Sequence, residues 1–401
     1  MSRSKKEPKG CGCAAIPLWV FLLLFAGGYG AYSQRDKIDL ISLIPEDIQA
    51  KIPLIRTASP ASPPVHVSLP TPTPVETQPT PTATPTPSPT ISVTPTPSTT
   101  PTPTTPWEKK VIRGIYLSRY QVTNNASEKT IRDRVRYYKS QGFNTIIHGV
   151  WGNACTMYKS EVMQKTLGYA SCPNQFQDQW LTWMIDEAHQ QNMEVHAYFE
   201  KGIKIDENSP IFDLAVEKGW IVAGVDRTHP GVDHYVLDVE KPEVANFFKN
   251  ILVEFVQKYP TIDAVQWDDY LGYHAELPGK VDRTAKLTTF VQNMIGSMKQ
   301  ANPNVSFDIC HHNPYWAKRY FAADWQNWDV DRVFIQVYSD ENFSEEMKYV
   351  RKYNGIAITE RQFNRLDDLA KNSEIESILL FPLSGKPEET AAQLQQIVVN
   401  E

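Results

Sequence analysis

Two adjacent carboxylates, Asp268 and Asp269, are the side chains of this 401-residue chain whose context best suits chemistry. They end a mostly apolar run, 262–268, that has the composition of a buried β-strand. In parallel α/β barrels, the carboxyl ends of the strands carry the catalytic residues. Glycoside cleavage needs two carboxyl groups, one protonated to assist the leaving oxygen and one ionised to act as base or nucleophile. The competing interpretation of the pair is a solvated strand end that caps the next helix.

The elements that would position this pair are short apolar runs that alternate with helical segments. Eight runs cover residues 111–117, 144–151, 194–200, 262–268, 305–311, 332–338, 355–359 and 376–381. Helices are predicted at 128–141, 178–192, 242–259, 282–301 and 387–399. This alternation predicts an α/β fold, a (β/α)8 TIM barrel, with long loops after the second and third strands. Both loops would lie on the same face as Asp268.

Alternation along each strand predicts which side chains point into the barrel, because residues two apart share a face. The third run then turns His196, Tyr198 and Glu200 inward, and the fourth turns Gln266 and Asp268 inward. The remaining inward polar candidates are Asn144, His148, Asp308, His312, Gln336 and Tyr338. A barrel filled only for stability would use Val, Ile and Leu in these layers, so the polar set favours an active site.

The candidate site residues follow from these positions. Asp268 is the first choice for one catalytic carboxyl group. For the second, the candidates are Glu200, Asp269 and Glu360, and Glu200 ranks narrowly ahead of Glu360, which lies just beyond the seventh run. The side chains expected to bind substrate are His148, Trp151, His196, Tyr198, Tyr270, His312, Gln336 and Tyr338. For these residues a structural hydrogen bond is an equal alternative.

Several stretches, in this order, resemble the glycosyl-hydrolase-like family ten of bacterial TIM-barrel proteins. They include Arg113-Gly114-Ile115-Tyr116-Leu117, Glu194-Val195-His196-Ala197-Tyr198, Trp267-Asp268-Asp269-Tyr270 and Gln336-Val337-Tyr338. The resemblance runs nearly the full length of the barrel. It implies a glycoside hydrolase that acts on peptidoglycan glycan strands stripped of their stem peptides.

The resemblance also implies roles for particular positions. The Asp-Asp-Tyr motif of the family falls on Asp268, Asp269 and Tyr270, and its polar third strand falls on His196 and Tyr198. The chain departs from the family after the fifth strand, where a His-His-Asn-Pro sequence at 311–314 replaces a Ser-Pro-Phe-Gly-like turn. Relatives vary at the end of the third strand, so the role of the second carboxylate is not carried over to this chain.

The N-terminal quarter of the chain has a different composition from the barrel. A basic segment precedes an uncharged apolar stretch, a pattern expected of an uncleaved transmembrane signal anchor rather than of a cleaved signal. A Pro/Thr-rich stretch follows, which is expected to be a disordered linker with a reach on the order of 150 Å. The predicted segments are 1–15 (cytoplasmic), 16–32 (anchor), 33–56 (juxtamembrane), 57–106 (linker) and 107–401 (barrel). This organisation predicts a single-pass protein of the cell membrane whose barrel is periplasmic or extracellular.

Cysteines and charge narrow the possible partners. Cys155 and Cys172 bracket the loop after the second run, and export would permit a disulfide between them. Cys310 lies on a predicted strand and is expected in the core. The net charge of −6 offers no basic patch, so no nucleic-acid partner is expected. Ten Trp and eighteen Tyr fit a polysaccharide substrate, since aromatic faces cover apolar sugar surface.

Two other functions compete with glycoside hydrolysis. A metal-dependent polysaccharide deacetylase would need a cluster of metal ligands, but the chain has no His-x-His or His-Glu-x-x-His pattern. His311 and His312 are adjacent on a strand and would face opposite ways. No metal or other cofactor is therefore expected. The second alternative is a catalytically inactive barrel that binds envelope glycan.

Overall fold

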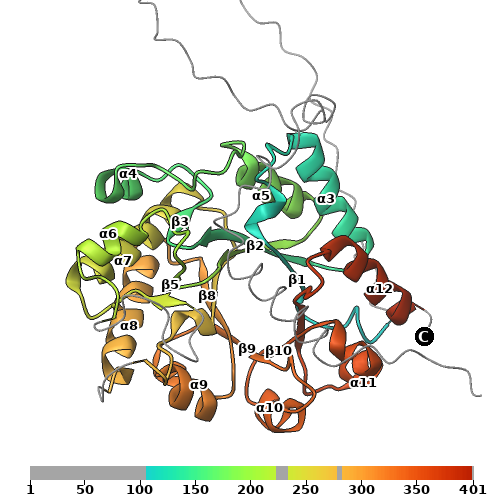
Figure 1. Ribbon diagram of the computed structural model, residues 1–401. Helices are drawn as coiled ribbons and strands as arrows, with labels where there is room; N and C mark the ends of the chain where they lie inside the picture. Colours follow the sequence, from blue (N-terminus) through green and yellow to red (C-terminus); the bar gives the residue numbers. More distant parts are fainter. Residues whose placement is uncertain (1–104, 223–233, 278–281, 400–401) are drawn as a thin grey trace, which may run out of the picture. The chain divides into compact units, whose positions relative to one another are not determined.

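The computed structural model describes residues 105–222, 234–277 and 282–399. Eight parallel strands in this part of the chain close into a barrel, and helices surround it (Figure 1). The strand order is β1-β11-β10-β9-β8-β7-β4-β2, and β2 pairs back with β1. The barrel strands are β1 (Arg113–Leu117), β2 (Thr145–Gly152), β4 (Glu194–Phe199), β7 (Ala264–Asp268), β8 (Ser306–His311), β9 (Arg332–Gln336), β10 (Gly355–Ile358) and β11 (Ser377–Leu380). The predicted TIM barrel is confirmed.

Amphipathic helices cover the outside of the barrel. α3 (Glu128–Ser140) begins after Ser127, whose side chain accepts a hydrogen bond in the first turn, and buries Ile131, Val135 and Tyr138 on one face. The other predicted helices correspond to α5 (Trp180–Gln190), α7 (Pro242–Lys258), α8 (Thr284–Ala301) and α12 (Pro387–Val399). Shorter helices that the sequence did not indicate are α4 (Glu161–Leu167), α6 (Phe212–Glu217), α9 (Pro314–Phe321), α10 (Phe343–Val350) and α11 (Leu366–Lys371). Single 3-10 turns are η1 (Arg119–Gln121), η2 (Asp269–Leu271), η3 (Trp325–Asn327) and η4 (Glu360–Arg365).

The long loops after β2 and β4 contain strands of their own. In the first loop, β3 (Cys155–Thr156) turns back antiparallel to β2. In the second, β5 (Lys204–Ile205) pairs with β6 (Tyr235–Val236). Both loops start at the carboxyl ends of barrel strands, so they belong to the mouth of the barrel, the end that carries catalytic residues in this fold.

A disulfide joins Cys155 to Cys172 within the first loop, as predicted. The two cysteines are separated by 17 positions and are buried. By the loop-entropy estimate, closing a loop of this length stabilises the fold by about 3 kcal/mol. We therefore expect the Cys155→Ser/Cys172→Ser double variant to unfold at a lower denaturant concentration by this free energy. Chemical denaturation of both proteins measures it, and equal midpoints would contradict the expectation.

Side chains on β4 and β7 alternate as the sequence predicted. Val195, Ala197 and Phe199 belong to the core between strands and helices, as do Val265 and Trp267, and the rings of Phe199 and Trp267 stack 4.6 Å apart. A separate buried cluster fills the barrel interior. It consists of Ile112, Tyr116, Ile147, Tyr198, Cys310, Phe334, Ala357 and Leu379.

The predicted orientation of β2 is wrong. Ile147, not His148, lies in the interior cluster, where it pairs in register with Tyr116. The His148 ring is fully buried on the other face of β2 and packs against Trp180 of α5, with 4.6 Å between ring centroids. Burial lowers the pKa of His148 to about 3, so this ring is neutral. Asn144 precedes β2, and its side chain accepts a hydrogen bond from the Arg113 N–H.

The predicted cytoplasmic segment, anchor and juxtamembrane segment, with all but the last two residues of the linker, lie outside the described residues. In the part of the chain that the structure does describe, no helix is both long enough and apolar enough to cross a membrane.

Candidate active site

Asp268 ends β7 inside the mouth of the barrel, with only 7% of its surface exposed. One of its carboxylate oxygens accepts a hydrogen bond from the Tyr270 N–H at 2.9 Å, which caps η2. The other accepts a short hydrogen bond from the hydroxyl of Tyr198, on the neighbouring strand β4. Strand position and register therefore place Asp268 where the sequence predicted.

Asp269 points to a different side of the mouth. Its carboxylate accepts a hydrogen bond of 3.2 Å from the Gln336 amide, which lies two strands away at the end of β9. The ammonium of Lys204 lies 3.4 Å from the Asp269 carbonyl oxygen and 4.2 Å from the Tyr270 ring centroid. The two adjacent carboxyl groups are thus held by opposite walls, Asp268 by β4 and Asp269 by β9.

The two carboxyl groups have opposite proton affinities. Burial raises the pKa of Asp268 to about 7, and the negative charge of Asp269 adds to this effect. Burial would also raise the pKa of Asp269, but the charge of Lys204 and the Gln336 hydrogen bond help to lower it below the usual value. Near neutral pH the mouth therefore holds one carboxyl group that can donate a proton and one that is ionised. Glycoside hydrolysis requires this combination.

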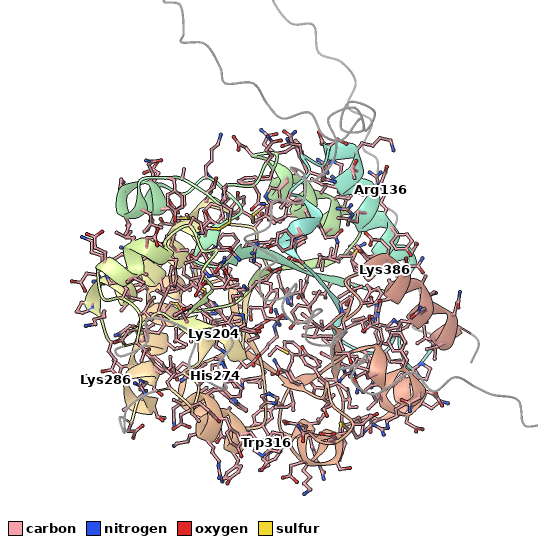
Figure 2. The ribbon with its side chains drawn as sticks, viewed as in Figure 1. Arg136, Lys204, His274, Lys286, Trp316 and Lys386 are labelled. Atoms are coloured by element: carbon pink, nitrogen blue, oxygen red, sulfur yellow. A yellow bond between two sulfur atoms is a disulfide. The ribbon has the colours of Figure 1, made fainter. Side chains whose placement is uncertain are left out.

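Lys204 was not a candidate from the sequence, although it is nearly fully buried beside the Asp pair. It stands on β5, and the preceding turn brings it to the mouth (Figure 2). In that turn Gly202 has a φ of 45°, and a Cβ there would lie 2.4 Å from the Tyr270 carbonyl oxygen. The indole N–H of Trp151 donates to the Gly202 carbonyl at 3.0 Å. Trp151, expected to bind substrate, is itself buried among Phe side chains outside the strands and supports this turn instead.

Glu200 is engaged by the first turn of chain after β1. Its carboxylate accepts hydrogen bonds from the backbone N–H of Arg119 at 2.9 Å and from its guanidinium at 2.8 Å. Burial raises the pKa of Glu200, while the Arg119 charge opposes the rise. Gly149 makes room for this pair, since a Cβ there would lie 2.2 Å from Glu200 Oε1. Glu200 therefore lies at the mouth, as expected, in a buried ion pair.

Glu360 holds a loop instead of facing the Asp pair. Its carboxylate accepts hydrogen bonds from the backbone N–H groups of Leu383 and Ser384 and from the Thr390 hydroxyl. All three donors belong to the segment that joins β11 to α12. These bonds lower the pKa of Glu360 despite its partial burial. Its position explains the residue as a structural anchor.

We expect Glu200→Gln and Glu360→Gln each to keep turnover within about tenfold of the wild type, because neither carboxylate is free to react. Each change weakens charge-assisted hydrogen bonds, so the unfolding free energy should fall by about 1–3 kcal/mol. Turnover on glycan and thermal unfolding measure the two effects. Loss of turnover by several orders of magnitude in either variant would make that residue a catalytic carboxylate.

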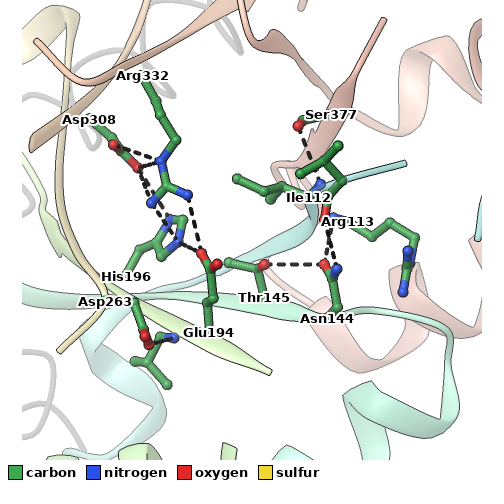
Figure 3. A network of polar contacts seen from close by, with 12 residues as sticks. Ile112, Arg113, Asn144, Thr145, Glu194, His196, Asp263, Asp308, Arg332 and Ser377 are labelled. Atoms are coloured by element: carbon green, nitrogen blue, oxygen red, sulfur yellow. Dashed lines mark hydrogen bonds and ion pairs between the residues drawn. The ribbon is translucent and has the colours of Figure 1, made fainter. Parts of the chain in front are cut away.

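His196 points into the barrel as predicted, but it lies at the opposite end from the Asp pair. There it contacts Glu194 at 2.8 Å, and Arg332 bridges Glu194 and Asp308 (Figure 3). The His196 hydrogen bond lowers the pKa of Glu194 to about 2. An adjoining hollow of about 400 Å³ is lined by the starts of strands, including Glu194, Ser306 and Arg332. This network closes the base of the barrel, and the expected contact of His196 with substrate at the mouth is not supported.

The remaining candidates lie around the mouth. The Tyr338 ring stacks on Phe381, and its hydroxyl is 3.7 Å from Cys310 Sγ. His312 follows β8, and its Nδ1 is 3.0 Å from the buried carboxylate of Glu346. The sequence candidates that the structure brings together are Asp268, Asp269, Tyr198, Tyr270, Gln336 and Tyr338.

Two further mouth residues were missed. Tyr116 packs edge-on against Tyr198 at 5.2 Å and could have been found from the alternation of β1. His311 is fully buried near Asp269, and neither ring nitrogen has a hydrogen-bond partner among the described residues. Burial lowers the pKa of His311 to about 3, so it is neutral. No three His, Cys, Asp or Glu side chains within the described ranges are grouped so that they could hold a metal ion.

Comparisons with known proteins agree with this architecture. Residues 111–282 match the family model described as Glycosyl hydrolase-like 10. The chain is 28% identical over 176 residues to glycosyl hydrolase DigH of Escherichia coli K12, and the match covers 38% of this chain and 36% of that protein. DigH of Shigella flexneri gives the same values. The match thus spans about a third of the length of these relatives.

Among solved structures, the PgaB (BpsB) glycoside hydrolase domain from Bordetella bronchiseptica has a similar fold. The similarity covers 72% of this chain and 99% of that domain, with a TM-score of 0.51 and 9% sequence identity. At this identity the likeness concerns the fold alone. The family match, by contrast, includes the Asp268-Asp269-Tyr270 motif at the barrel mouth. Residues 111–282 of the barrel therefore belong to the glycosyl hydrolase-like 10 family, as the sequence resemblance predicted.

Proposed function

We propose that this protein is a glycoside hydrolase that cleaves a cell-envelope polysaccharide, with denuded peptidoglycan glycan strands as its substrate. The observation that carries the proposal is the Asp268–Asp269 pair, in which burial and Lys204 drive the two pKa values apart at the mouth of a glycosidase-like barrel. The family match supports hydrolysis of glycosides, and the similarity to the DigH proteins supports an envelope glycan.

In the proposed reaction, Asp268 donates its proton to the oxygen of the leaving sugar. The Tyr198 hydroxyl and Tyr270 N–H then stabilise the carboxylate that remains, because both donate hydrogen bonds to it. Asp269 supplies the ionised carboxylate that activates water or stabilises the positive charge on the sugar. Gln336 and Lys204 keep it oriented and ionised. Tyr116, Tyr198 and Tyr338 line the wall beside the pair.

The test uses the full-length chain in detergent micelles and glycan strands freed of stem peptides. New reducing ends should appear, and mass spectrometry of the fragments identifies the bond that is cut. Strands that still carry their peptides serve as the comparison substrate. Binding of the glycan without any cleavage between about pH 4 and 8 would favour a catalytically inactive binding barrel over the hydrolase.

We also propose that residues 16–32 tether the barrel to the cell membrane, with the barrel on the periplasmic or extracellular side. The basic flank before this apolar segment supports that orientation. Protease added to intact spheroplasts should therefore release or digest the barrel. Protection of the barrel, while an exported control protein is digested, would reverse the orientation.

A further inference from the structure

A continuous row of aromatic side chains leads from the Asp pair onto α9. The Lys204 ammonium, beside Asp269, lies 5.4 Å from the ring centroid of Phe321 at the end of α9. The Phe321 ring stacks on His312 with 5.6 Å between centroids. His312 in turn lies 6.0 Å from Trp316, on the first turn of α9. The row therefore connects the mouth to a helix of the outer layer without interruption.

The outer end of this row is exposed to solvent. Trp316 lies 6.5 Å from Tyr320, which is 43% exposed, and Tyr315 is 55% exposed. The Arg319 guanidinium lies 5.4 Å from the Tyr320 ring and 5.8 Å from the Tyr315 ring. In Figure 2 Trp316 lies at the edge of the molecule, with Lys204 closer to the barrel centre. We call Tyr315, Trp316, Arg319 and Tyr320 the α9 surface.

Such exposure needs a reason, because large aromatic side chains lose free energy when they stay in water. Two of the six large hydrophobic side chains described as exposed are on the single helix α9. Aromatic faces pack well against the C–H faces of sugar rings, and a guanidinium donates hydrogen bonds to hydroxyl and carboxylate oxygens. The surface thus has the chemistry of a saccharide platform.

We propose that the α9 surface binds sugar units of the same glycan chain that is cleaved at the Asp pair, several units away from the scissile bond. The inference rests on the proposed hydrolase function and adds a preference for long chains. The occupant is a glycan rather than a protein because the surface is continuous with the mouth through His312 and Phe321. A polymer cut within its length must extend out of the mouth, and α9 offers it aromatic contacts.

The test compares long denuded strands with short oligosaccharides of the same composition. The Tyr315→Ala/Tyr320→Ala double variant should lower kcat/KM on long strands by about 5- to 50-fold, mainly through KM. Turnover of the short oligosaccharides should stay unchanged, because they do not reach α9. Both side chains are exposed, so the fold should tolerate the change.

Two controls accompany the double variant. Tyr315→Phe/Tyr320→Phe keeps both rings and should keep long-strand kcat/KM near the wild-type value. Val111→Ala removes an exposed apolar side chain beside the start of β1, at the far end of the barrel, and should change neither substrate.

The outcomes separate this proposal from the hydrolase proposal. Equal losses on long and short substrates, or no loss on either, would overturn the role of α9. Wild-type turnover of the short oligosaccharides tests hydrolysis by itself. If it is absent, sedimentation of the wild type and the double variant with long insoluble strands still tests the platform, since weaker binding by the variant supports it and equal binding overturns it.

Discussion

Asp268→Asn is expected to lower turnover on denuded glycan strands by about 10²- to 10⁴-fold, because the amide cannot donate the proton that the leaving sugar needs. The fold should survive, since the Asn oxygen can still accept the Tyr270 N–H that caps η2. The pKa of Asp268 is raised in the folded state to about 7. Ionisation of this residue therefore favours the unfolded chain as the pH rises above the ordinary carboxyl value. The amide removes that penalty, so the melting temperature at pH 7 should equal or exceed that of the wild type.

Steady-state kinetics and thermal unfolding of the same samples measure these two effects. Glu200→Gln and Glu360→Gln are matched controls, because each also replaces one carboxylate by an amide, in a residue held by hydrogen bonds of its own. Near-normal turnover of Asp268→Asn, with an unchanged melting temperature, would remove this residue from the mechanism. A loss of turnover that merely follows a loss of folded protein would also count against the assignment.

Lys204→Met should change the pH dependence of turnover more than any other single substitution in the loop after β4. In the wild type, activity should fall as the pH rises through about 7, where Asp268 loses its proton. On the acidic side, activity should fall where Asp269 becomes protonated. The Lys204 charge lowers the pKa of Asp269, so its removal should move this acidic limb upward by about 1–2 pH units. Near pH 5 the variant should then be about 10- to 100-fold slower than the wild type.

The pH profile of kcat/KM measures this shift. Lys204→Arg keeps the positive charge and should keep the acidic limb near its wild-type position. Lys201→Met is the matched control, because Lys201 belongs to the same loop but pairs with Asp206. An unchanged acidic limb in Lys204→Met, with a uniform loss at every pH, would mean that Lys204 acts through packing on Tyr270 and not through its charge.

Several features could be read from the sequence because they depend on local patterns. The eight strands and the longer helices follow from hydrophobic periodicity, which neighbouring residues set by themselves. On β4 and β7 one face is apolar and the other polar, so period-two alternation alone placed Tyr198 and Asp268 inside. The disulfide between Cys155 and Cys172 followed from their positions at the two ends of one loop.

Other features were decided by tertiary pairing. β2 is apolar on both faces, so alternation could not choose between Ile147 and His148. Its register with β1 and β4 turned Ile147 inward and placed Gly149 under the Glu200 carboxylate. The depth of a side chain along the barrel is also set by how far neighbouring strands are staggered. His196 is therefore inward, as expected, but it lies at the base with Asp308.

The electrostatics of the site belong to the tertiary structure most of all. The sequence places Asp268 and Asp269 side by side, and by itself predicts nothing about which of them keeps its proton. That difference arises from burial of both groups and from Lys204, which lies 64 positions before Asp268 on a two-residue strand with no sequence signal of its own. Local patterns determine which residues occupy a strand and where it ends. The charges that surround those residues come from loops that only the folded chain brings together.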